Sequence, residues 1–179
     1  MQRRCILRHV FLIILFICLV AVPAFAVSKA EQQTFKNSVI TVPAGELINS
    51  VLTTPLNSSA LQQGQTISVV VTEDFYYNSK LVIPADSMIY GNVISVDRTA
   101  ESNSPDKMLL RFTQIITPSG VQIPIAALIQ SKDCLGMISG NDEEYKNYKG
   151  HIVIDVGTPF SLYLTQPITV NQEAYNSNY

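Results

Sequence analysis

The sequence predicts an all-β fold: a single small β-barrel, or a barrel-like sandwich, of short antiparallel strands behind a signal peptide. Short segments rich in Val, Ile, Thr and aromatic residues recur at roughly ten-residue spacing, which is typical of such folds. Gly, Pro and Asn separate these segments, and no stretch after the first 26 residues has the apolar period of an amphipathic helix. A closed barrel also leaves no strand edge open to aggregation.

Residues 1–26 have the three parts of an export signal. A basic start with Arg3, Arg4 and Arg8 precedes an apolar run from Val10 to Val22. The run ends in Ala24-Phe25-Ala26, the small-x-small pattern that signal peptidase cleaves. We therefore expect cleavage after residue 26 and a location in the periplasm, in the cell envelope or outside the cell.

Two other interpretations of this N-terminal segment stay open. Val10 to Ala26 is 17 residues long, the lower limit for a helix that crosses a bilayer, so the segment could be retained as an anchor. Cys18 could carry a lipid, although Phe16 and Ile17 are bulkier than the residues that usually precede a lipidated cysteine. Pro23 and the small residues at the exit favour cleavage.

Cleavage would leave 153 residues, enough for one domain with its own core. We expect a flexible leader over 27–38, a β-barrel domain over 39–170 and a disordered tail over 171–179. The signal contains three of the twelve basic side chains and none of the fourteen acidic ones, so the remainder has a net charge of −5. This acidic chain has no basic cluster, which argues against a nucleic-acid partner.

The first strands are expected from β-branched content and from turn residues. Val39–Val42 and Glu46–Thr53 flank the turn Pro43-Ala44-Gly45. Asn and Ser residues and Gly64 mark a connector from Pro55 to Gly64. In the strand Thr66–Thr72, Ile67, Val69 and Val71 share one face by period two.

The next strands follow the turns Asn78-Ser79 and Pro84 to Ser87. Lys80–Ile83 is a short strand, and Met88–Asp97 is a long one with apolar residues on both faces. Ile89, Gly91, Val93 and Ser95 form one face of the long strand. We expect the core face to be the other one, which carries Met88, Tyr90, Asn92, Ile94 and Val96.

The second half of the chain begins with a hairpin. Met108–Ile116 and Val121–Leu128 flank the tight turn Pro118-Ser119-Gly120. Thr99–Lys107 is a polar loop, and Ser131–Gly150 is a long loop with at most a short helical turn. The last strands are expected at His151–Val156, Pro159–Leu164 and Ile168–Val170.

The sequence offers little chemistry. Cys134 is the one cysteine after the signal, and with His151 it makes the sole candidate nucleophile and base pair, which no spacing brings together. Glu73 and Asp74 are neighbours and so point to opposite faces of a strand. The acidic run from Asp142 to Glu144 lacks the spacing of a calcium loop. We predict a non-enzymatic protein with no metal and no cofactor.

Three adjacent aromatic residues are the binding candidates. Strand alternation places Phe75 and Tyr77 on one face and Tyr76 on the other. An exposed aromatic side chain can hold a sugar, a peptide or a partner surface. Packing on the core is the alternative interpretation. The loops 99–107 and 131–150 are further candidates, since loops often carry function.

A series of motifs runs through the first two thirds of the chain: Ala44 to Ile48, Leu52 to Ser58, Gly64-Gln65 with Val69 to Glu73, Leu81 to Ser87, Gly91, Leu109 to Phe112 and Ile115 to Gly120. In this order they resemble the C-terminal domain of TrbI-type conjugation proteins, the outer-membrane core component of type IV secretion channels. The resemblance covers about residues 42–128. It implies a β-barrel that assembles into a ring in the cell envelope. Asp86 stands where the family has glycine before the serine of its Ile-Pro-x-Gly-Ser motif, so we expect this turn to differ.

Together these observations predict an exported envelope protein, a stand-alone relative of the TrbI-type barrel that acts by protein–protein interaction or assembly. Its expected partners are envelope proteins or further copies of itself, and it would meet a membrane only by association after signal cleavage. A small-ligand or glycan-binding module that uses the barrel mouth is the alternative, and a hydrolase acting through Cys134 and His151 is a third possibility.

Overall fold

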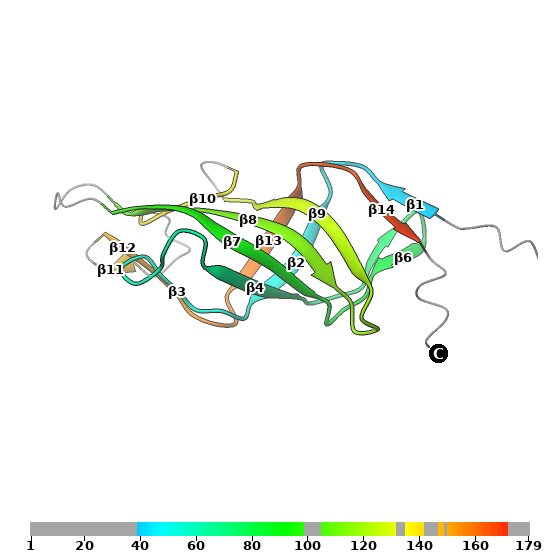
Figure 1. The fold of residues 1–179 in the computed structure, drawn as a ribbon, viewed down its shortest axis with the longest axis horizontal. Helices are drawn as coiled ribbons and strands as arrows, with labels where there is room; N and C mark the ends of the chain where they lie inside the picture. Colours follow the sequence, from blue (N-terminus) through cyan, green and yellow to red (C-terminus); the bar gives the residue numbers. More distant parts are fainter. Residues whose placement is uncertain (1–38, 99–104, 132–134, 142–146, 149, 172–179) are drawn as a thin grey trace, which may run out of the picture. The chain divides into compact units, whose positions relative to one another are not determined.

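The computed structural model describes residues 39–98, 105–131, 135–141, 147–148 and 150–171. The expectations about the signal peptide, the leader, Cys134, the acidic run, residues 99–104 of the candidate loop and residues 172–179 of the tail fall outside these residues. Asn171, which was predicted to begin the disordered tail, instead ends the last strand. The described residues form strands and connecting turns (Figure 1). The strands are β1 Val39–Val42, β2 Leu47–Leu52, β3 Leu56–Asn57, β4 Thr66–Val71, β5 Phe75–Tyr77, β6 Lys80–Ile83, β7 Met88–Asp97, β8 Lys107–Ile116, β9 Gln122–Ile129, β10 Met137–Ser139, β11 Asn147–Tyr148, β12 His151–Ile154, β13 Pro159–Leu164 and β14 Ile168–Asn171.

Six antiparallel strands close into a barrel. They follow one another in the order β8-β7-β4-β2-β13-β9, and β9 pairs again with β8. β10 adds to the first half of β8, through Met137↔Leu109 and Ser139↔Lys107, where β9 no longer pairs with it. The expectation of an all-β barrel is therefore confirmed.

Side chains fill the interior of this barrel, as expected for so few strands. Fully buried residues come from every barrel strand; among them are Ile48, Ile67, Ile89, Phe112, Ile129 and Leu162. Smaller sheets extend the same core: Ile40 and Val170 join it from the ribbon β1–β14, Val82 from β5–β6, and Leu56 and Ile152 from β3–β12. The described part of the barrel thus has a packed core in place of a lumen.

Most strand predictions are confirmed within one or two residues. The hairpin β8–β9 has Thr117 N donating to Val121 O at 2.9 Å, and Gly120 takes a φ of +84° in the turn. Ile67, Val69 and Val71 share the buried face of β4, as predicted. The expectation of one long loop over 131–150 was wrong, because β10 and β11 lie within it.

The prediction for the core face of β7 was wrong from Met88 to Asn92, whereas Val96, which follows a register shift between Val93 and Ser95, packs against the core as predicted. Ile89, Gly91 and Val93 point into the barrel, whereas Met88 and Tyr90 point outward and are half-buried. A Cβ on Gly91 would collide with the carbonyl oxygen of Arg111 and lie 2.8 Å from Phe112 Cδ1. The face with fewer large side chains is the inner one because the backbones of β7 and β8 approach closely beside Phe112.

The turn before β7 keeps a left-handed residue despite the missing glycine. Asp86 takes a φ of +62°, a conformation that Asp tolerates better than most residues other than glycine. Its N–H donates to Val71 O at 3.0 Å, and Ser87 Oγ donates to Pro84 O at 2.7 Å. The turn thus holds an aspartate in the left-handed conformation that glycine adopts most easily.

Candidate functional site

The predicted aromatic cluster forms β5, one arm of a two-stranded hairpin with β6. Phe75 and Tyr77 pack against the core, while Tyr76 is 57% exposed on the other face. The alternation predicted from the sequence is thus confirmed, and core packing accounts for two of the three rings. Asn78 and Ser79 both take positive φ at the tip, as a two-residue hairpin turn requires. Tyr76 is the ring that remains available to a partner.

Asp74 fixes the position of Tyr76. The phenol donates to Asp74 Oδ2 at 3.2 Å, and Asp74 Oδ1 accepts from Ala85 N at 2.8 Å. The negative charge of Asp74 raises the pKa of Tyr76, and the hydrogen bond and slight desolvation add to the effect. The carboxylate therefore keeps the ring neutral and oriented on the hairpin surface.

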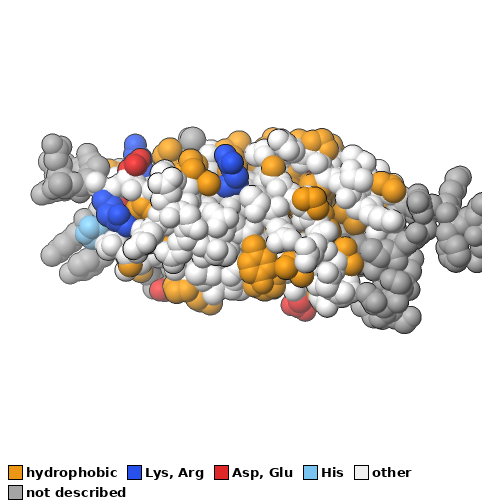
Figure 2. Space-filling model, viewed as in Figure 1, with side chains coloured by type: hydrophobic (Ala, Val, Ile, Leu, Met, Phe, Trp, Pro, Cys, Tyr) orange, Lys and Arg blue, Asp and Glu red, His pale blue; other side chains and the backbone are white. Residues whose placement is uncertain are grey.

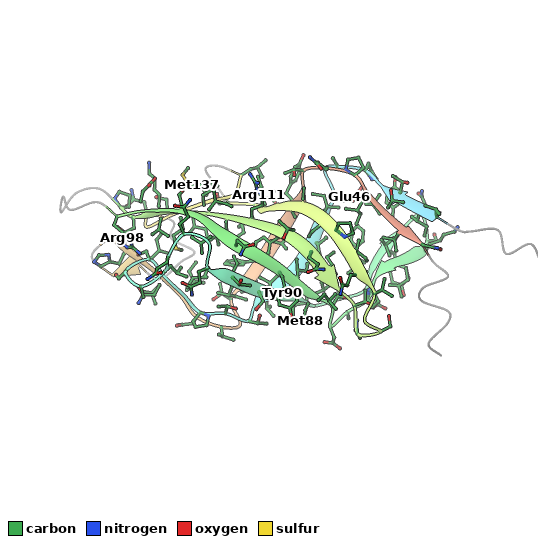
Figure 3. The ribbon with its side chains drawn as sticks, in the orientation of Figure 1. Glu46, Met88, Tyr90, Arg98, Arg111 and Met137 are labelled. Atoms are coloured by element: carbon green, nitrogen blue, oxygen red, sulfur yellow. The ribbon has the colours of Figure 1, made fainter. Side chains whose placement is uncertain are left out.

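A second surface lies on the outer wall of the barrel, over β4, β7 and β8. The register places Val70 beside Met88 and Met88 beside Ile116, so three apolar side chains form one row across three strands. We call these three residues the Met88 row. Tyr90 stands next to it, between Ser68 and Gln114. Figure 2 shows apolar side chains gathered on this part of the surface. Figure 3, in the same orientation, labels Met88 and Tyr90 there.

This wall carries no charge along β4 or along β7 as far as Ile94. Its outward residues are Thr66, Ser68, Val70, Met88, Tyr90, Asn92 and Ile94. The first cation across the wall is Arg111 on β8, which pairs with Asn92 in register. We call the seven outward residues the β4–β7 wall. A neutral, partly apolar strip on the outside of a protein is typical of a surface that contacts a partner.

The end of the barrel near β12 contains a buried polar cluster that the sequence did not reveal. Ser58 Oγ donates to Asp106 Oδ2 at 2.5 Å, and His151 Nδ1 lies 3.0 Å from the same oxygen. Asp106 is 2% exposed and Ser58 is fully buried. Ile152 N donates to Ser58 Oγ at 2.9 Å, and Arg98 Nε donates to Ser58 O at 2.7 Å.

This Ser, Asp and His set does not have the arrangement of a nucleophilic triad. In a triad the serine hydroxyl donates to the imidazole, and the carboxylate holds the other ring nitrogen. Here the carboxylate lies between the two side chains and takes both contacts, and the hydroxyl is closed to solvent. The cluster instead ties together the end of β3, the start of β8 and β12, because Ser58 follows β3, Asp106 precedes β8 and His151 begins β12.

Other chemistry is also sparse in the described ranges. They contain no group of three or more His, Cys, Asp or Glu side chains that could hold a metal ion. Among these same residues, no helix is long and apolar enough to cross a membrane. The Cys134 and His151 pair stays a prediction, since Cys134 lies outside the described residues.

Comparison with known proteins agrees with the barrel. The family model described as bacterial conjugation TrbI-like protein matches residues 41–153, which is more than half of the chain. The chain belongs to this TrbI-like family. No curated protein is significantly similar to it in sequence.

A solved structure has the same fold. ComB10 of the Com type IV secretion system of Helicobacter pylori is 16% identical and has a TM-score of 0.50. The alignment covers 75% of this chain and 93% of that one. At this identity the likeness concerns the fold alone. The TrbI-like match extends the resemblance predicted over residues 42–128 through β12.

Sequence reasoning found the exposed Tyr76 but missed the β4–β7 wall. The available signal is the pattern of β7, which has apolar residues on both of its faces. In a closed barrel a strand with apolar residues on both faces must leave one set outside.

Proposed function

We propose that this TrbI-like chain is an exported, non-enzymatic protein of the bacterial envelope that acts by protein–protein interaction or assembly in conjugation or secretion. The β4–β7 wall is the observation that carries the proposal. Its side chains are neutral, and all except the exposed Thr66 are half-buried, so a partner could cover them without leaving an unpaired charge. The filled interior also favours work on the outer surface over transport through a lumen.

Tyr76 is the second contact in this proposal. Its ring is exposed and held by Asp74, which lowers the entropic cost of docking. Tyr is also among the residues that contribute most at protein interfaces. The partners are other envelope proteins or further copies of the chain, and the hairpin and the wall are the surfaces that would meet them.

The mass of the assembled protein tests the proposal. The full chain is expressed in a bacterial host, extracted gently from the envelope and weighed under native conditions beside Tyr90→Glu and Thr169→Glu. Thr169 is an exposed strand residue on β14, away from the wall. We expect a large assembly for the parent chain and for Thr169→Glu, and a much smaller species for Tyr90→Glu. A parent chain that is monomeric in every fraction would contradict the proposal.

Export is tested on the same samples. An intact mass that begins at Val27, in protein recovered from the envelope, is the expected result. A mass that includes residues 1–26 would instead indicate a retained anchor. Uncleaved protein found solely in the cytoplasm would contradict the proposed location.

A further inference from the structure

A polar groove lies on the outer wall of the barrel, on β2 and β13. It has a volume of about 370 Å³, within the range of roughly 300 to 1,000 Å³ typical of binding clefts. It forms where β9 leaves β13, and Gln130 N donates to Ser161 O at 2.8 Å at that point. The residues that line it with their side chains are Asn49, Val51, Thr72, Gln130, Pro159 and Ser161.

The floor of the groove has an apolar half and a polar half. Val51 pairs with Pro159 in register, and Asn49 pairs with Ser161 two residues further on. These four residues alternate with Ser50 and Phe160, which are buried, so their side chains point outward. A ligand lying across both pairs would rest partly on carbon and partly on hydrogen-bonding groups.

Asn49 and its partners hold the polar half in place. Asn49 Nδ2 donates to Glu73 Oε1 at 2.7 Å, and Ser161 Oγ donates to Asn49 Oδ1 at 3.4 Å. Thr72 Oγ1 donates to Asn49 O at 3.3 Å on the same side. These bonds run across β2, β13 and the end of β4, so the donors and acceptors are placed before any ligand arrives.

Glu73 brings a negative charge to one end of the groove. Within the described residues, the amide of Asn49 is the one hydrogen-bond partner of its carboxylate, and no Lys or Arg pairs with it. None of the lining side chains is charged. A cation is therefore the complement that this end lacks.

The backbone of β13 supplies an acceptor beside the groove. Leu52 N donates to Thr158 O, and Leu164 N donates to Glu46 O. The backbone N–H and C=O groups of the even-numbered residues of β13 therefore point toward β2, and those of the odd-numbered residues point away from it. Ser161 O accepts from Gln130 N, whereas no described residue donates to the carbonyl of Pro159. This carbonyl suits a peptide N–H.

From these observations we propose that the groove binds an extended peptide segment of a partner protein, with a Lys or Arg side chain directed at Glu73. The stem of that side chain would lie on Val51 and Pro159, and its charged end would meet the carboxylate. The side-chain amide of Gln130 and the backbone carbonyl of Pro159 would form hydrogen bonds with the peptide backbone. The proposal rests on the proposed function only for the source of the peptide.

Three heptapeptides test the groove. The acetylated and amidated peptide GVSRSVG is compared with counterparts that carry methionine or glutamate in place of arginine. Binding to the isotope-labelled protein is followed through backbone amide resonances in NMR titrations. We expect the arginine peptide to shift Asn49, Thr72, Gln130 and Ser161 saturably, and to bind about fivefold more tightly than the methionine peptide, the upper range for an exposed ion pair.

The variants Glu73→Gln and Glu46→Gln distinguish an ion pair with Glu73 from a general effect of the protein's negative charge. Both variants remove one carboxylate, and Glu46 lies on the barrel outside the groove lining (Figure 3). We expect Glu73→Gln to weaken the arginine peptide about fivefold, to the level of the methionine peptide, and Glu46→Gln to leave it unchanged. Asn49→Ala, which frees Glu73, should weaken it by a smaller factor.

Several outcomes would overturn the groove proposal. Equal affinity for the three peptides, resonance shifts outside the groove, absence of binding by any of them, or an unaltered arginine peptide with Glu73→Gln would each do so. The native mass of the Glu73→Gln variant distinguishes failure of the groove proposal from failure of the proposed function. If that mass equals the mass of the parent assembly while the peptide fails to bind, the groove proposal alone fails.

Discussion

Along β7, Ile89 and Val93 point into the barrel and are fully buried, whereas Met88 and Tyr90 point outward and are half-buried. The outer side chains of Met88 and Tyr90 are similar in size to the inner ones or larger, and they are largely apolar apart from the hydroxyl of Tyr90. Packing on the core explains the inner set. It does not explain the outer set, which lies beside Val70 and Ile116 in a strip without charge. Folding buries the inner set, and the outer set is the part of β7 that the proposed partner would cover.

The largest expected difference between the two faces concerns stability. Ile89→Ala removes a fully buried side chain and should lower the free energy of unfolding by about 3 kcal/mol, within the range of 2 to 5 kcal/mol for such changes. Met88→Ala, its neighbour on the outer face, should cost under about 1 kcal/mol. Urea denaturation of both variants measures the difference. Equal losses would mean that the outer face is buried by the fold itself.

The second prediction concerns the close approach of β7 and β8. Gly91→Ala places a Cβ against the carbonyl of Arg111 and against Phe112, so we expect a loss of about 2 kcal/mol, as for overpacked cores. Asn92→Ala, one position along on the outer face, is the control; it loses only the hydrogen bond from Asn92 Nδ2 to Gly64 O and should cost about 1 kcal/mol or less. Both values come from the same urea titrations. A stable Gly91→Ala variant would show that β8 can move aside.

The third prediction concerns the turn that leads into β7. Asp86 has positive φ where the family has glycine, and this conformation costs a non-glycine residue about 1 kcal/mol. Asp86→Gly should therefore raise the melting temperature, with a gain of under about 1 kcal/mol because glycine also loses more chain entropy on folding. Asp86→Ala, which lacks this freedom, should not stabilise. A lower melting temperature for Asp86→Gly would show that the carboxylate itself stabilises the turn.

The smallest expected effect concerns the phenol of Tyr76 on the β5–β6 hairpin. The pKa of Tyr76 is raised in the folded protein by Asp74, so the contact stabilises the fold below the ordinary tyrosine pKa of about 10 and is lost as pH rises through the folded pKa. Ultraviolet pH titrations are recorded for the parent chain and for Tyr76→Phe, and the second curve is subtracted from the first. The difference should show a phenol that ionises at a higher pH than a model tyrosine. Asp74→Asn should return it toward the ordinary value. An unchanged titration in Asp74→Asn would remove the carboxylate as the cause.

The sequence was informative about the barrel and less so about its surface. Alternation in Thr66–Thr72 and the turn at Pro118 to Gly120 placed strands and buried residues correctly, because each depends on local pattern. The inward face of β7 depends on Gly91 fitting beside Phe112, a contact between two strands that no single-strand pattern contains. The cluster of Ser58, Asp106 and His151 is equally hidden, since 48 residues separate its serine from its aspartate.

The most direct test of the central claim is a photo-crosslink from the wall itself. Benzoylphenylalanine is placed at position 90, on the β4–β7 wall, or at position 169, on β14, and living cells are irradiated before the envelope is extracted. The account predicts that position 90 yields crosslinked protein of discrete mass, which mass spectrometry assigns to another envelope protein or to a second copy, and that position 169 yields little. Equal yields at both positions, or none at position 90 in cells that contain the folded chain, would contradict it.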